Sequence, residues 1–211
     1  MSFAFSILGR GLAGRSLAAA WGSRVALLDH ESRPEGLVLL AVPDRFVEGL
    51  SACFPGRCAH LSGSLHVPGV PCAHPLTSFD GQAWDWTGTP LATTGVVPEV
   101  ILGAFRALGF APFELSPEQK ALYHAAAVLS SGHAATLWLG AASLLEAGGV
   151  TLPGRGLLPL AEATLRNLAV HGAAGRTGPF ARGDEATIAR DAAALPENWK
   201  DLFLRLGHRL D

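Results

Sequence analysis

Residues 3–21 form the stretch FAFSILGRGLAGRSLAAAW, from which much of the topology can be predicted. It begins with an apolar, β-prone run at 3–8 and continues through the pattern G-x-G-x-x-G at 9–14. It then becomes rich in alanine and leucine, as a helix would be. This order predicts a strand, a tight turn and a helix, which is the context that gives the glycine pattern its meaning.

The three glycines of this turn suit the binding of a dinucleotide pyrophosphate. Gly9 would permit the sharp turn, Gly11 would let the backbone approach the phosphates, and Gly14 would let helix and strand pack closely. The exposed N–H groups at the start of the helix would attract the anion. We therefore expect a cofactor-binding loop made of Gly9, Arg10, Gly11, Leu12, Ala13 and Gly14.

The composition is that of a globular protein with ordinary charge. The 211 residues are 49% hydrophobic and 16% charged, with a net charge of −2. They lack the basic field that nucleic acid or an anionic membrane would require. No leader-like segment precedes the first strand and the apolar runs are interrupted, so we expect a cytoplasmic protein without a membrane span. The three cysteines lack metal-ligand or disulfide spacing, which predicts idle thiols and no metal site.

Asp29 ends a second predicted strand at 24–28 and lies 20 residues after Gly9. An acid at this place would accept hydrogen bonds from the adenosine ribose, which favours NAD over NADP. Alternatively, Asp29 is a solvated turn residue, and the neighbouring His30 and Arg33 could still favour a 2′-phosphate. The expected cofactor is therefore NADP or NAD.

The third predicted strand, GLVLLAV at 36–42, follows after only seven residues, whereas a parallel crossover usually needs a dozen or more with a helix inside. This predicts a Rossmann-like parallel sheet that is shortened after its second strand. Val42 and Pro43 would meet the cofactor at the strand's carboxyl end, or serve architecture alone, and Asp44 would cap a helix. Ser62 follows another strand and would lie near the nicotinamide, or simply form a turn.

His74 and Pro75 follow a short predicted strand at 70–73. The imidazole would face the same edge of the sheet, where it could exchange a proton with a carbonyl, hydroxyl or imine during hydride transfer. A structural turn histidine is the alternative.

A long helix is predicted from Ser116, as N-cap, through Pro117 and Gln119 to about residue 148. It is apolar or small on most faces and must be covered nearly all round. Helices predicted at 158–171, 185–194 and 199–209 would cover part of it, and a second subunit would cover the rest. We place a domain boundary near Leu115.

Lys120, His124 and Ser131 share one stripe of this helix, flanked by Tyr123 and Ser130. A polar stripe on a buried apolar helix needs partners, which a substrate crevice between the domains would provide. Lys120, His124 and Ser131 are thus catalytic candidates with His74, and Tyr123 and Ser130 are substrate-binding candidates. The alternative is an exposed first turn with a solvated Lys120.

The loop at 177–184, TGPFARGD, precedes a helix that Asp184 can cap. Arg182 could bind a substrate carboxylate or pair with an acid of its own fold.

Six segments carry a resemblance to a known family: ILGRGLAGRSLAAAW, LLAVPD, HLSGSL, AHPLTSF, KALYHAAAVLSSGHAATL and TGPFARGD. Together they resemble the Rossmann-like proteins of domain-of-unknown-function family 2520, relatives of the deazaflavin-dependent NADP oxidoreductases. The resemblance implies an α/β nucleotide-binding domain at 1–115. It also implies an all-helical domain at 116–211 of the 6-phosphogluconate dehydrogenase C-terminal type, and a homodimer formed through those helices.

Two wider similarities bear on the site. LSSGHAATL is similar to a substrate-lining helix of pyrroline-5-carboxylate reductase, which implies that Ser130 and Ser131 meet the substrate. AHPLTSF is similar to a His-Pro motif of prephenate dehydrogenase, which supports His74. Family members carry another helix and short strand after the position of Asp29, and this chain does not.

These observations favour an NAD(P)-dependent oxidoreductase acting on a small carbonyl, imine or hydroxyl compound. The alternatives are a dinucleotide-binding or sensing protein without catalysis, and a structural dimer with a vestigial nucleotide site.

Overall fold

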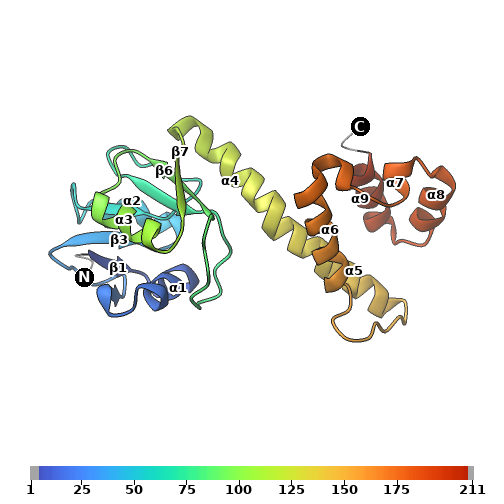
Figure 1. The fold of residues 1–211 in the computed structure, drawn as a ribbon, viewed down its shortest axis with the longest axis horizontal. Helices are drawn as coiled ribbons and strands as arrows, with labels where there is room; N and C mark the ends of the chain where they lie inside the picture. The colour runs from blue at the N-terminus through green and yellow to red at the C-terminus, as the bar shows by residue number, and fades with distance from the viewer. Residues whose placement is uncertain (1–4, 209–211) are drawn as a thin grey trace. The chain divides into compact units, whose positions relative to one another are not determined.

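The computed structural model describes residues 5–208 and divides into two compact units, Met1–Ala134 and Ala135–Asp211 (Figure 1). The predicted strand start at Phe3 and helix end at Arg209 lie outside the described residues. The α/β class, with a Rossmann-like sheet followed by helices, is confirmed.

The first unit holds a seven-stranded sheet in the order β2-β1-β3-β4-β5-β6-β7. The strands through β5 run parallel, but β6 is antiparallel to β5, and β7 is parallel to β6. The sheet is therefore mixed rather than wholly parallel. Its strands are β1 Phe5–Leu8, β2 Ala26–Leu28, β3 Leu37–Leu40, β4 Cys58–His60, β5 Cys72–Pro75, β6 Pro90–Thr94 and β7 Ala111–Glu114.

The edge strand β7 was not predicted. All four of its residues are exposed, and Pro112 stands in the middle of it. Such a strand lacks the apolar alternation that identifies a half-buried strand, and proline is tolerated there because the strand lies at an edge.

Helices cover both faces of the sheet. On one face, α1 Leu12–Trp21 and α3 Glu99–Ala107 bury Leu17, Trp21 and Phe105 against Ile7. On the other, α2 Asp44–Ser51 contributes Val47 and Leu50 to a cluster that contains Leu8. Ile7 and Leu8 are adjacent on β1 and enter different clusters, as expected when successive strand residues point to opposite faces.

The connection between β2 and β3 is a short loop, residues 29–36, that crosses from one side of β1 to the other. Side chains replace the usual crossover helix in holding it. Arg33 Nη1 donates to the carbonyls of residues 30–32 at 2.8–3.2 Å. Arg57 Nη1 donates to the carbonyls of residues 34–36 at 2.6–3.0 Å. The sheet is thus shortened where the sequence predicts it, and β2 forms its edge.

The predicted long helix runs from Pro117 to Ala147. It comprises a first 3-10 turn Pro117–Gln119, α4 Lys120–Val128, a π-helical turn Leu129–His133 and α5 Ala134–Ala147. The Gln119 side chain accepts from Ser116 N at 3.0 Å, which closes the predicted capping box. In the described part of the chain this one helix is long and apolar enough to cross a membrane. A single helix of this kind is weak evidence for a membrane span, because core helices of soluble proteins meet the same criteria of length and composition.

The second unit is helical, with α6 Leu158–His171, α7 Pro179–Arg182, α8 Glu185–Ala193 and α9 Glu197–Gly207. Asp184 caps α8 as predicted, since its side chain accepts from Thr187 N at 3.1 Å. Compactness groups α4 with the sheet, up to Ala134. The predicted boundary near Leu115, as a limit of independent folding, stays a prediction.

Candidate functional site

The glycine turn after β1 has the backbone that the sequence predicts. Gly9 has φ of 118°, and a Cβ there would come closer than 3.0 Å to Ala41 O, which real Cβ atoms essentially never do. A Cβ on Gly14 would overlap Gly9 O in the same way. Gly11, the N-cap of α1, is exposed, and a Cβ added to it would have no atom within 4 Å. Two glycines therefore make the turn possible, and the third leaves bare backbone open to a ligand.

The ends of the flanking strands lie against this turn. Gly9 N donates to Leu28 O at 3.0 Å, and Ala41 N donates to Leu8 O at 2.8 Å. These bonds bring the segment Val42–Pro43 beside the glycines. Asp44 is not the N-cap of α2 as predicted, because Pro43 holds that position. Asp44 is instead the first helical residue, where its carboxylate suits the positive helix end, and it accepts from Ser64 Oγ at 2.9 Å.

Asp29 organises the short loop after β2. Its Oδ1 accepts from Glu31 N and Ser32 N at 3.0 Å and from Ser32 Oγ at 3.1 Å. The Ser32 hydroxyl and these backbone bonds lower the pKa of the exposed carboxyl. One oxygen of Asp29, Oδ1, is therefore engaged in the turn itself, as the alternative of a turn aspartate expected. The contact of Asp29 with the ribose stays a prediction. Arg33 is engaged with loop carbonyls rather than held ready for a phosphate.

A cavity of about 350 Å³ lies between β5 with its following loop and the long helix, within the first unit. It brings together four of the predicted residues, His74, His124, Ser130 and Ser131. The other lining residues are Leu76, Thr77, Ser78, Ala127 and Val128. Parallel strands that end at one edge of a sheet place this cavity on the same edge as the glycine turn.

His74 forms the centre of a ring cluster. Its Nδ1 lies 2.8 Å from the Tyr123 hydroxyl, and its ring centroid lies 6.1 Å from that of His124. A Cβ on Gly63 would come within 2.8 Å of His74 Nε2 and 2.7 Å of His124 Cδ2. Gly63 is thus the residue that lets the loop after β4 lie against both rings. Gly63 is not among the predicted site residues, although a glycine between two serines after a strand could have indicated a close approach of the backbone.

The hydrogen-bonded pair of His74 and Tyr123 is electrically neutral near pH 7. Burial, with the neighbouring His124 and Lys120, lowers the pKa of His74 to about 4. Burial also raises the pKa of Tyr123 to about 12. The imidazole is therefore uncharged and the phenol protonated, so one proton is shared along the bond between them. His74 can donate or accept a hydrogen bond without carrying a charge.

Lys120 does not line the cavity. It is 1% exposed, and its Nζ donates to Ser62 O at 3.0 Å and to Cys72 Sγ at 3.1 Å. The alternative of a solvated lysine is therefore wrong, because the first turn of α4 docks into the sheet. Cys72, which sequence reasoning left idle, donates to the same Ser62 carbonyl at 3.0 Å, and burial raises the pKa of its thiol.

Ser62 itself forms a turn. Its Oγ accepts from Leu65 N at 2.9 Å, and its N donates to His60 Nδ1 at 3.2 Å. Burial lowers the pKa of His60 to about 4, so this acceptor nitrogen stays unprotonated near neutrality. Because Lys120 Nζ donates both to Ser62 O in the loop after β4 and to Cys72 Sγ in β5, it links the loop to that strand.

The π-helical turn positions the two serines of the cavity. Ser130 Oγ and Ser131 Oγ both donate to Ala127 O, at 3.0 and 2.9 Å. Single π-helical turns are frequent at functional sites. Because each hydroxyl donates its hydrogen to a backbone carbonyl of the helix, it can only accept hydrogen bonds from a ligand. A molecule in the cavity would meet these serines with its own N–H or O–H groups.

Arg182 ends α7 in the second unit and is exposed. Its predicted contact with a substrate carboxylate stays a prediction.

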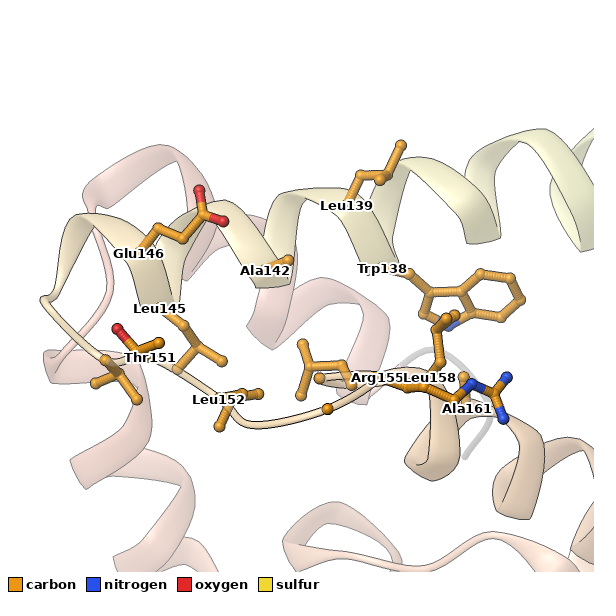
Figure 2. A pocket seen from close by; sticks show the side chains of 14 residues that line it. Trp138, Leu139, Ala142, Leu145, Glu146, Thr151, Leu152, Arg155, Leu158 and Ala161 are labelled. Atoms are coloured by element: carbon orange, nitrogen blue, oxygen red, sulfur yellow. The ribbon is translucent and has the colours of Figure 1, made fainter.

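The second unit has a larger cavity of about 500 Å³, formed by the end of α5, the loop that follows it and the start of α6. Figure 2 shows Leu145 and Leu152 facing the space between helix and loop. Two charged residues line it, Glu146 and Arg155, and Arg155 forms an ion pair with Glu162. No histidine lines this cavity, whereas His74 and His124 both line the smaller one. Among the described residues 5–208, no cluster of three His, Cys, Asp or Glu could hold a metal ion.

Comparisons with known proteins agree with this architecture. A family model described as a domain of unknown function, DUF2520, matches residues 94–210, more than half of the chain. A search of curated proteins finds no match.

Solved structures with the same fold include BF3122 from Bacteroides fragilis, named as a candidate NADP oxidoreductase. It has a TM-score of 0.77 and 20% identity, over 99% of this chain and 98% of that one. Protein TM1727 from Thermotoga maritima has a TM-score of 0.74 and 18% identity, over 98% and 96% of the two chains. A reductive aminase from Aspergillus terreus, in complex with NADPH and ethyl levulinate, has a TM-score of 0.61 and 16% identity, over 98% and 92%. At these identities the likeness shows the fold.

Proposed function

Because this chain belongs to the DUF2520 family, whose name leaves its activity open, we propose a function from the site itself: an NAD(P)-dependent oxidoreductase. Its substrate would be a small carbonyl, imine or hydroxyl compound in the histidine cavity. The observation that carries the proposal is the open backbone at Gly11. It lies between Gly9 and Gly14, two positions at which no larger residue fits. The names of two similar structures, an NADP oxidoreductase candidate and an NADPH-bound aminase, support it.

In this proposal the backbone N–H groups of the glycine turn and of the start of α1 bind the pyrophosphate, with Arg10, Leu12 and Ala13 around it. Val42, Pro43 and the loop at Ser62 would border the nicotinamide. When bound, the dinucleotide supplies or accepts the hydride. Everything else that the reaction needs would come from side chains of the cavity.

His74, neutral and bonded to Tyr123, would polarise the substrate oxygen or nitrogen through a hydrogen bond. His124, which lines the same cavity from the long helix, would exchange the proton that accompanies hydride transfer. Ser130 and Ser131, with their own protons committed to Ala127 O, would accept from N–H or O–H groups of the substrate. An amine, an imine that carries an N–H, or an alcohol fits this acceptor pair better than an aprotic compound.

Lys120 has a different role in this scheme. Its ammonium holds Ser62 O and Cys72 Sγ together and does not reach the cavity. It would act as a positioning residue that fixes the loop carrying Gly63 against the two histidine rings.

We include a homodimer in the proposal. Large apolar side chains on the helices of the second unit are exposed in the single chain, among them Leu139, Leu160, Leu165 and Val170. Where exposed apolar side chains adjoin one another, they typically mark a protein–protein interface. A second copy of the chain would cover this surface. Arg182, which also lies in the second unit, would bind a carboxylate of the substrate.

A thermal-shift titration with NAD, NADH, NADP and NADPH tests the proposal. A ligand at a hundred times its Kd stabilises the folded chain by about 2.7 kcal/mol. Absence of a shift with all four would refute dinucleotide binding. Where one binds, hydride exchange with imines, ketones and alcohols tests catalysis, and His74→Asn should lower turnover about 100-fold while cofactor Kd stays unchanged.

A sensor without catalysis is the second candidate. The short loop at 29–36 favours it, because a complete crossover helix would normally frame the adenosine half of the cofactor. Cofactor binding without hydride exchange across the whole panel would support the sensor and refute the enzyme.

A further inference from the structure

Three planar side chains meet at the surface beside the glycine turn. The His30 ring stacks on Phe46, with centroids 5.9 Å apart and planes at 25°. The Arg45 guanidinium carbon lies 4.6 Å from the centroid of the same phenyl ring. His30 follows β2, and Phe46 lies in the first turn of α2 after β3. Since β2 and β3 flank β1, the group borders the turn that begins at Gly9.

The backbone presents this group rigidly. On the His30 side, Asp29 and Arg33 form hydrogen bonds within the loop at 29–36. Arg57 holds the end of that loop by donating to the carbonyls of residues 34–36. On the Phe46 side, α2 begins immediately after a strand that is hydrogen-bonded to β1. Phe46 is nevertheless 40% exposed. Aromatic side chains that are already held in place can stack on a flat ligand with little additional loss of conformational entropy.

We propose that His30, Phe46 and Arg45 form an adenine seat that takes the place of the missing crossover helix. The inference rests on the proposed function, because a dinucleotide whose pyrophosphate lies on the glycine turn must extend its adenosine half toward β2. The base would join the stack through its π-face, and Arg45 would add a cation–π contact. Asp29, next to His30, would then lie beside the ribose.

The seat also explains how a shortened domain keeps its ligand. Without a helix between β2 and β3, the outer side of the adenosine half stays open to solvent. The binding surface must therefore come from the opposite side, which is α2. Phe46 lies there, two residues after the first residue of the helix, Asp44.

Calorimetric titration of Phe46→Ala with NADPH or NADH, and separately with ADP, tests the seat without any activity measurement. Loss of one base stack should weaken the Kd about tenfold, which corresponds to about 1.4 kcal/mol. The loss should be equal for the dinucleotide and for ADP, because both contain the adenine. Phe46→Trp should restore affinity. Val100→Ala, at a helical residue that is 42% exposed and part of α3, is the matched control and should bind like the native chain.

The outcomes separate the seat from the proposed function. If the native chain binds no dinucleotide, the proposed function fails and the seat fails with it. If it binds and both Phe46→Ala and His30→Ala retain the native Kd, the seat alone is refuted. A loss for the dinucleotide that is absent for ADP would also refute it, because the effect would then lie outside the adenosine half. Thermal unfolding of each variant in the absence of ligand identifies any loss that comes from misfolding.

Discussion

Replacing Gly14 and Gly11 in turn by alanine separates the two tasks of the glycine turn. A methyl group on Gly14 would approach the carbonyl oxygen of Gly9 closer than 3.0 Å. Gly9 is hydrogen-bonded to the end of β2 and Gly14 lies within α1, so neither backbone segment can move aside cheaply. Overpacking of this kind costs about 3 kcal/mol, which lowers Tm by roughly 6 to 12 °C in a chain of this size. We therefore expect Gly14→Ala to be strongly destabilised before any ligand is added.

Gly11→Ala should behave in the opposite way. Gly11 has φ of −69°, which alanine adopts readily, and no atom lies within 4 Å of the new methyl group. Its free energy of unfolding should stay within about 1 kcal/mol of the native value. Its dinucleotide Kd should rise at least about tenfold, because the methyl group would stand where the pyrophosphate approaches.

Urea unfolding and calorimetric titration measure both effects on the same samples. A Gly14→Ala variant with native stability would show that helix and strand do not meet as closely as the geometry requires. A stable Gly11→Ala variant with native dinucleotide affinity would show that the open backbone is not a phosphate site.

The buried polar groups and the exposed helices lead to three more predictions. First, folding depresses the pKa of His60 and His74 from about 6.5 to about 4, so the unfolded chain binds more protons between these values. Stability should be complete above pH 6.5 and fall as the pH decreases toward 4, and urea unfolding of His60→Asn should show a smaller decrease. Second, Lys120→Ala removes a buried side chain and both its hydrogen bonds, so unfolding should become easier by about 3 kcal/mol; Lys200→Ala, at a partly exposed lysine, is the control. Third, Leu165→Glu should convert a dimer to a monomer in light scattering, whereas a native chain that is monomeric at all concentrations would refute the proposed assembly.

Much of the first unit could be predicted from local sequence. The glycine turn, the short connection after β2 and the capped long helix each depend on contiguous residues whose backbone preferences are strong. Glycine at a positive φ, proline at a first helical position and a side-chain cap act within a few residues of one another. Asp44 shows the limit of this reasoning, since Pro43 and Asp44 both suit the start of α2 and only the folded backbone distinguishes their positions.

The chemistry of the site could be predicted only in outline. Periodicity placed His124, Ser131 and Lys120 on one stripe of the long helix, and strand order placed His74 at the same edge of the sheet. Periodicity and strand order identify residues that share an edge of the sheet, but not which of them reach the same cavity. Lys120 turns into the sheet toward Cys72, and the two histidines meet over Gly63.

The first strand, turn and helix, the shortened sheet and the helical second half could thus be predicted in advance, because each follows from short-range backbone preferences and apolar periodicity. Three further properties became evident only from the folded chain: Lys120 is buried, His74 is neutral and hydrogen-bonded to Tyr123, and His30 stacks on Phe46. These properties depend on burial and on distances of a few ångströms between residues far apart in the chain, and no local pattern specifies either.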